Sequence, residues 1–160
     1  MTVTRLNHAV LFVRDADAAA DFYDRSFGFI RLPSPPGMRA AFMRAAGTDN
    51  HHDLGLFEVG AAAPRPPRGS VGLYHLAWEV ATIEDLVAMA RTLSEAGALT
   101  GTSDHGVSKS LYGRDPDGNE LEVMWRVPRE AWGDNADEAV VRPLDLEAEL
   151  ARWGAGSSVA

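Results

Sequence analysis

Residues 6–13, LNHAVLFV, repeat their apolar pattern at residues 73–80, LYHLAWEV, and each stretch carries a histidine at its third place. Short apolar stretches of this length predict β-strands. A repeat at an offset of 67 positions indicates two copies of one supersecondary unit. His8 and His75 therefore occupy equivalent places in the two copies.

The same order of elements follows each of these strands. Thr82 and Asp85 form a capping-box pattern at the start of the second predicted helix. The predicted helices lie at about 17–27 and 82–97, and the predicted strands that follow them lie at 40–45, 53–59, 108–114 and 120–127. We therefore expect an α+β fold of two tandem βαβββ modules, at residues 4–60 and 71–127.

The remaining segments are interpreted as a linker and a tail. Residues 61–70 contain three prolines and a glycine, which prevent a regular helix or strand, so they are the predicted linker. Residues 1–127 then form one domain, and residues 128–160 are expected to be a C-terminal docking arm. Leu146, Leu150 and Trp153 line one face of a possible helix at 144–153, and residues 154–160 are expected to fray.

The composition excludes several kinds of site. The 160 residues include no cysteine, which excludes disulfides, thiolate zinc sites and thiol nucleophiles. The net charge is −8 and Lys109 is the only lysine, which argues against a nucleic-acid partner. No apolar run reaches the roughly 18 residues of a membrane span, and the amino end has no signal-peptide pattern. We expect a soluble, cytoplasmic protein that acts on a small molecule, with no membrane partner.

The repeated histidines are candidate metal ligands. A single histidine on an apolar strand is usually a core residue, but two at equivalent places favour ligands. Two histidines and one carboxylate make the facial arrangement that holds non-haem Fe(II) and leaves coordination positions open. The pattern does not decide which carboxylate is the third ligand. A glutamate near a hairpin, such as Glu120, or an isolated one, such as Glu79, usually faces water, and Glu122 is the third candidate.

The repeat also predicts the number of protein ligands. The offset of 67 places Gly55 at the position equivalent to Glu122, so the fourth symmetric place holds no ligand. Three ligands suit a metal that binds a chelating substrate together with a second reactant. Asp53 and Glu58 are the alternative fourth ligands.

Three stretches resemble a known family: LNH at 6–8, LYH at 73–75 and DHGVSKSLYGRDPDGNELE at 104–122. They are similar to the vicinal oxygen chelate (glyoxalase, bleomycin resistance and dioxygenase) superfamily. Within it, residues 4–127 most resemble the single-domain type I extradiol catechol 2,3-dioxygenases. The DPDGN turn supports the fold, whereas HHD at 51–53 and DHGVS ahead of Tyr112 are more specific for the dioxygenases.

The resemblance implies a half-open mixed barrel around a metal site. It implies Fe(II), with Mn(II) or another divalent metal as alternatives, on His8, His75 and Glu122. It also implies that His52 is the acid and base, while His105 and Tyr112 contact the substrate oxygens. The implied reaction is ring cleavage of a catechol-like aromatic diol by O2, a step in the catabolism of aromatic compounds.

The acid–base residue stays open between two histidines. His52 lies three residues before Gly55, so strict alternation places it on the opposite face of the strand. A bulge or turn at residues 51–52 is needed for His52 to reach the site. Otherwise Asp53 points inward and the role passes to His105, while His51 is interpreted as a solvated turn residue.

Proteins of this fold also have two other functions, which the residues disfavour here. A glyoxalase-like isomerase or lyase is disfavoured by Gly55 and by the joint presence of His52, His105 and Tyr112. A metal-free antibiotic-binding module of the same fold is disfavoured by the intact ligand set. An exposed sheet edge and an amphipathic tail predict a homodimer.

Overall fold

The computed structural model describes residues 2–65, 67 and 69–155. The chain divides into two compact units. The first comprises Met1–Ser70 together with the turn Asp115–Gly118, and the second comprises Val71–Arg114 and Asn119–Ala160. The division of the chain into a 1–127 domain and an arm at 128–160 stays a prediction.

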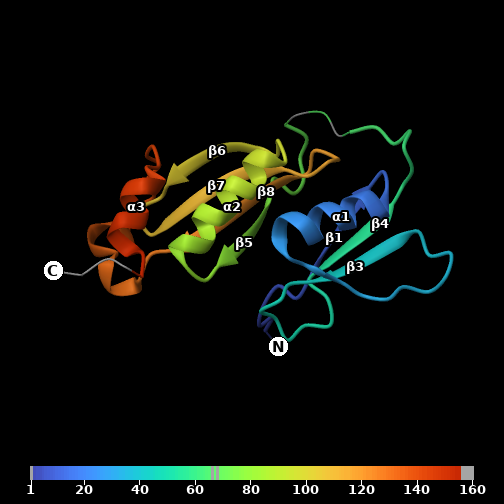
Figure 1. Ribbon diagram of the computed structural model, residues 1–160, viewed down its shortest axis with the longest axis horizontal. Coiled ribbons are helices and arrows are strands. Elements are labelled where there is room, and N and C mark those ends of the chain that lie inside the picture. Colours follow the sequence, from blue (N-terminus) through green and yellow to red (C-terminus); the bar gives the residue numbers. More distant parts are fainter. Residues whose placement is uncertain (1, 66, 68, 156–160) are drawn as a thin grey trace. The chain divides into compact units, whose positions relative to one another are not determined.

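The first unit is a four-stranded mixed sheet with one helix. Strand β1 pairs with β4 in parallel, and the other pairs are antiparallel, in the order β1-β4-β3-β2. Helix α1 covers one face of this sheet (Figure 1). The elements are β1 (Ala9–Val13), α1 (Ala16–Phe27), β2 (Ile30–Arg31), β3 (Ala40–Arg44) and β4 (Leu54–Glu58).

The second unit repeats this topology. Its sheet has the order β5-β8-β7-β6, with β5 parallel to β8, and helix α2 packs on it (Figure 1). The elements are β5 (Leu76–Val80), α2 (Ile83–Glu95), β6 (Leu99–Asp104), β7 (Ser108–Arg114) and β8 (Glu120–Arg126). The α+β prediction of two tandem βαβββ modules is confirmed. Among the described residues neither mixed sheet closes into a barrel.

The helix boundaries follow from local signals in the sequence. The Asp15 side chain accepts hydrogen bonds from the backbone nitrogens of the first turn of α1, and the helix ends at Gly28 with φ 65°. The predicted capping box of α2 is present: Thr82 accepts from the Asp85 nitrogen, and the Asp85 carboxylate accepts from the Thr82 nitrogen. These caps satisfy backbone groups that the helices themselves leave unpaired.

Each helix buries its apolar face against its own sheet. Each fully buried aliphatic side chain contributes roughly 1.5–3 kcal/mol to stability. In the first unit the fully buried side chains include Tyr23, Met43, Leu54 and Leu56; in the second they include Leu86, Leu93, Leu111, Leu121 and Val123. The opposite face of β1 stays open, since Val10 is 51% and Phe12 is 73% exposed.

The turn at 115–118 is held by side chains of the first unit. The Tyr23 hydroxyl donates to the Asp115 carboxylate at 3.3 Å, and burial raises the pKa of Tyr23 above its ordinary value. Arg14 Nη1 lies 3.2 Å from Asp117 Oδ1, and the Arg14 backbone nitrogen donates to Asp117 Oδ2 at 3.0 Å. The turn is therefore part of the structure of the first unit.

The C-terminal residues pack on the second unit through helix α3 (Leu146–Trp153) and two 3-10 turns (Arg129–Ala131 and Gly133–Ala136). The buried Lys109 Nζ lies 2.6 Å from Asp104 Oδ1 and 3.1 Å from Glu149 Oε1 on α3. An ammonium buried between two carboxylates fixes the helix to the sheet.

The prediction that residues 154–160 fray is wrong for the first two of them. Gly154 is buried, and the Ala155 nitrogen donates to Glu84 Oε1 at 2.6 Å. Residues 156–160 lie outside the described residues. Across the described part of the chain, every helix is too short or too polar to cross a membrane.

Candidate functional site

His8 and His75 lie one residue before strands β1 and β5. The predicted strands at 6–13 and 73–80 therefore begin too early. Leu6 and Leu73 are 79% and 71% exposed, so neither has the buried environment that would extend a strand.

His75 and Glu122 come together in the second unit. His75 Nε2 lies 3.1 Å from Glu122 Oε2, and the two side chains are 28% and 12% exposed. Strand pairing explains this approach, because Glu122 is opposite Ala77, two residues after His75 on the parallel neighbour. His75 Nδ1 is buried without a hydrogen-bond partner among the described residues.

This pair fits a divalent metal. Two ligand atoms bound at right angles, each about 2.1 Å from an ion, lie roughly 3.0 Å apart. The nitrogen–oxygen separation of 3.1 Å has this size, and imidazole with carboxylate is a donor set suited to iron, manganese or zinc. The same separation is also that of a hydrogen bond, so the pair is pre-formed without an ion.

Tyr112 and His105 extend the same cluster. Tyr112 is opposite Glu122 in the β7–β8 register, and its ring centroid lies 6.0 Å from that of His75. The Tyr112 hydroxyl lies 2.8 Å from His105 Nε2. Burial, followed by the charge of the Glu122 carboxylate, raises the pKa of Tyr112, so its hydroxyl keeps its proton at neutral pH.

His8 and His52 lie together in the first unit, with ring centroids 4.6 Å apart. His52 also contacts the Phe42 ring, at 5.1 Å, and its Nδ1 lies 3.1 Å from that of His51. Burial lowers the pKa of His52, and the neighbouring His8 and His51 act in the same direction. His51 itself is exposed.

The backbone at residues 50–53 is irregular, which is how His52 reaches His8. Strand β4 begins only at Leu54, so strict alternation does not apply to His52. Asp53 is buried and directed into the loop, where its carboxylate accepts from the Ala45 nitrogen and from Asn50 Nδ2, both at 2.8 Å. This carboxylate is therefore engaged in holding the loop.

The other carboxylates considered from the sequence have cationic or backbone partners. Glu58 Oε1 accepts from Arg39 Nε at 3.0 Å, and Glu120 Oε1 accepts from Arg114 Nε at the same distance. Glu79 Oε1 lies 3.0 Å from Arg126 Nη2. At Gly55, a Cβ atom would meet Val10 Cγ2 at 3.3 Å, so this position has little space for a side chain.

The three predicted ligands divide between the units: His8 belongs to the first, and His75 and Glu122 belong to the second. Within residues 2–65, 67 and 69–155, no three His, Asp or Glu side chains are grouped closely enough to hold a metal ion. The complete three-ligand set therefore stays a prediction.

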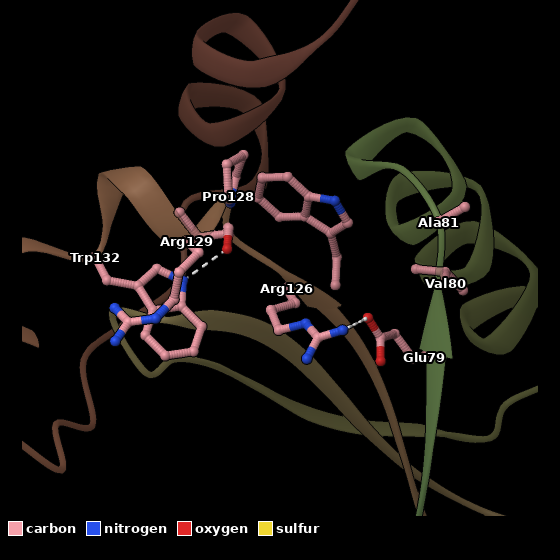
Figure 2. A pocket seen from close by; sticks show the side chains of 9 residues that line it. Glu79, Val80, Ala81, Arg126, Pro128, Arg129 and Trp132 are labelled. Carbon is pink, nitrogen blue, oxygen red and sulfur yellow. Dashed lines mark hydrogen bonds and ion pairs between the residues drawn. The ribbon is translucent and has the colours of Figure 1, made fainter. Parts of the chain in front are cut away.

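A pocket of about 780 Å³ lies at the ends of β5 and β8 in the second unit (Figure 2). Figure 2 shows Arg126 paired with Glu79 and the Arg129 guanidinium over the Trp132 ring, 4.3 Å from its centroid. Arg126 shares a face of β8 with Glu122, about 13 Å farther along the strand. The sequence repeat does not reveal this pocket, because Trp132, which lies beyond the repeat, completes its wall.

Comparison with known proteins shows the family to which this chain belongs. The model of the Glyoxalase/Bleomycin resistance protein/Dioxygenase superfamily matches residues 5–123. The chain is 36% identical over 130 residues to a catechol-2,3-dioxygenase of Bacillus subtilis (strain 168), covering 81% of this chain and 44% of that protein. It is 35% identical over 127 residues to biphenyl-2,3-diol 1,2-dioxygenase 3 of Rhodococcus globerulus, covering 78% of this chain and 65% of that protein.

The chain thus spans about half to two thirds of the length of these two relatives. Among solved structures, it is similar to a glyoxylase/bleomycin resistance protein/dioxygenase domain from Frankia sp. EAN1pec. That match has a TM-score of 0.65 and 25% identity, and it covers 80% of this chain and 96% of the other. Both the sequence motifs and the fold therefore lead to one conclusion: the chain belongs to the Glyoxalase/Bleomycin resistance protein/Dioxygenase superfamily.

Proposed function

We propose that this protein is an extradiol-type dioxygenase that cleaves the ring of a catechol-like aromatic diol with O2. The observation that carries the proposal is the cluster of His75, Glu122, Tyr112 and His105 in the second unit. In this cluster, His75 Nε2 and Glu122 Oε2, two atoms of metal-ligand type, lie 3.1 Å apart. The Tyr112 hydroxyl lies 2.8 Å from His105 Nε2. The names of the two dioxygenase relatives support the same reaction class.

The proposed metal is Fe(II), held by His75 and Glu122 together with His8 from the first unit. Bound Fe(II) would supply open coordination positions at which a diol and O2 react together. The ligand set is neutral except for one carboxylate, which leaves a net positive charge to attract the deprotonated diol oxygen.

The remaining residues of the cluster handle protons and orientation. A diol must lose a proton to chelate a metal, and imidazole is the kind of group that accepts it, so His52 and His105 are the candidates. The Tyr112 hydroxyl is beside Glu122 in the register, so it is placed to hydrogen-bond a diol oxygen bound there. The assignment of His52 as acid and base is part of the proposal.

Oxygen uptake tests this function. Full-length protein is loaded anaerobically with Fe(II) and mixed with a panel of catechols, while dissolved oxygen and the absorbance of a yellow ring-opened product are followed. We expect uptake with equal formation of product. Absence of uptake from protein that holds one iron per chain would contradict the proposal and favour the glyoxalase-like isomerase or lyase.

A pair of matched variants connects the activity to the site. Glu122→Gln removes the carboxylate that is proposed to bind the metal and that lies 3.1 Å from His75 Nε2, whereas Glu79→Gln removes one that pairs with Arg126. We expect the first variant to lose iron retention and uptake, and the second to keep both. If neither wild type nor variant retains a divalent metal, the protein would instead be a metal-free small-molecule binding module.

A further inference from the structure

The C-terminal tail reaches the proposed site at one point. We call residues 135–142 the tail segment; they lie beyond residues 5–123, which the family model matches. The segment is fixed beside β6, because Asp104 and Arg142 exchange two backbone hydrogen bonds, each of 2.9 Å. Both partners belong to the second unit.

One contact inside the segment and one to the loop that carries His105 extend this attachment. Within the segment, Arg142 Nη2 donates to Asn135 Oδ1 at 3.2 Å. Asn135 packs directly on Gly106, where an added Cβ atom would lie 2.7 Å from Asn135 Cγ. The loop and the segment are therefore in close contact on both sides of His105.

The Val140 carbonyl oxygen lies 2.9 Å from His105 Nδ1. A carbonyl oxygen only accepts hydrogen bonds, so Nδ1 must carry a proton for this contact to be favourable. In the neutral imidazole the proton is then absent from Nε2, which becomes an acceptor. The atom that faces Nε2 is the Tyr112 hydroxyl, at 2.8 Å.

The direction of the Tyr112 hydrogen bond follows from this. With Nε2 as acceptor, the Tyr112 hydroxyl donates to His105, and its oxygen keeps its lone pairs for another donor. The opposite tautomer would donate from Nε2 to Tyr112, and it would place the Nδ1 lone pair against the Val140 carbonyl. The tail segment therefore selects between two arrangements of the same side chains.

We propose that the tail segment is a positioning element for the site: the Val140 carbonyl holds His105 as the Nδ1–H tautomer, so that His105 Nε2 accepts a hydrogen bond from the Tyr112 hydroxyl. The Tyr112 oxygen can then accept a hydrogen bond from the protonated oxygen of a bound diol. The catalytic meaning of this arrangement rests on the proposed dioxygenase function, whereas the tautomer itself does not.

Nuclear magnetic resonance of the full chain without added metal tests the tautomer directly. Long-range proton–nitrogen correlation distinguishes protonated from unprotonated ring nitrogens, and the spectrum of His105→Gln identifies the signals of His105 among the five histidines. We expect Nδ1 of His105 to be protonated and Nε2 to be unprotonated. A dominant Nε2–H tautomer would overturn the proposal.

A change of one atom tests the role of the tail. Because the chain has no cysteine, residues 139–160 can be made synthetically, joined through a cysteine at position 139 and desulfurised to restore Ala139. The synthetic piece carries a thioamide in place of the Val140 carbonyl, which is a weaker acceptor. The same ligated chain with the normal oxygen is the matched control.

We expect the thioamide chain to show more of the Nε2–H tautomer than the control. In the iron-loaded protein we expect kcat to fall by roughly 10-fold while KM stays within about twofold, as for other partners behind a metal site. Equal tautomer ratios in the two chains would overturn the proposal. Absence of oxygen uptake in both chains would refute the dioxygenase function, while the tautomer ratio would still decide the role of the tail.

Discussion

Among single residues near the proposed site, Asp104 is a partly buried carboxylate with several charged and backbone partners. Its Oδ1 accepts from Lys109 Nζ at 2.6 Å and from the Gly106 nitrogen at 2.7 Å. Burial acts to raise the pKa of Asp104, but these hydrogen bonds and the charges of Lys109 and Arg142 outweigh it and lower the pKa. The carboxylate therefore stabilises the folded chain in its charged form.

Asp104→Asn should lower the free energy of unfolding by about 1–3 kcal/mol at neutral pH. Because the pKa is depressed in the folded state, this contribution is present above about pH 4, the usual carboxyl pKa, and is lost as the pH falls through the folded pKa. Urea unfolding of wild type and variant between pH 2 and pH 7 measures the difference in their free energies of unfolding. If that difference is as large at pH 2 as at pH 7, the explanation is contradicted. Asp49→Asn is the control, because Asp49 is 87% exposed and its ion pair with Arg5, at 3.6 Å, is also exposed.

At the scale of elements, the strand boundaries show what the sequence can predict. The alternating pattern located β1, β3, β4, β5, β7 and β8, because buried apolar side chains mark these strands. It did not locate β2, which has only two residues, both exposed, or β6, whose residues Leu99–Asp104 are mostly small and polar. These strands are defined by pairing with β3 and β7, which no local pattern records.

The candidate site, too, could be predicted only in part from the sequence. His75 and Glu122 could be predicted because the repeat and the family motif mark them, and His105 and Tyr112 because the motif contains them. The contact between His105 and Val140 joins residues 35 positions apart and uses a backbone oxygen, which carries no sequence signal. The division of the three predicted ligands between the two units, by contrast, follows from the two modules that the repeat predicts.

Strand β7 contains a glycine at which another strand approaches closely. A Cβ atom at Gly113 would lie 2.9 Å from the Ala98 carbonyl oxygen and 3.1 Å from Leu121 Cδ1. Gly113→Ala should therefore destabilise the protein by roughly 1–3 kcal/mol, because the sheet must shift to admit the methyl group. Gly101→Ala on neighbouring β6 is the control, since nothing lies within 4 Å of its Cβ position. Equal urea midpoints for the two variants would contradict this account of the sheet.

At the scale of the whole molecule, the proposal requires the metal to take ligands from both units. A ligand that binds only the folded chain adds about 2.7 kcal/mol of stability at 100 times its dissociation constant. Added Fe(II), or Mn(II) as a redox-stable substitute, should therefore raise the Tm of the wild type. His8→Ala and Glu122→Gln should each abolish the rise, and His51→Ala should retain it. A full rise in His8→Ala would show that the second unit binds the metal alone.

Homodimer formation also belongs to this scale and stays a prediction. Light scattering should give about twice the chain mass of 17.2 kDa. A mass of one chain at micromolar concentration would contradict it.

The turn at 115–118 has a consequence for the order of folding events. The β7–β8 hairpin that it closes is local in sequence, whereas the bond between Tyr23 and Asp115 spans 92 positions. Local pairings form before distant ones, because closing a long loop costs entropy. Tyr23→Phe should then leave the folding rate nearly unchanged and mainly speed unfolding, so that stopped-flow chevrons shift only in the unfolding limb. The residues that secure the turn would thus slow unfolding. They would set the lifetime of the folded chain and have little effect on the rate at which it forms.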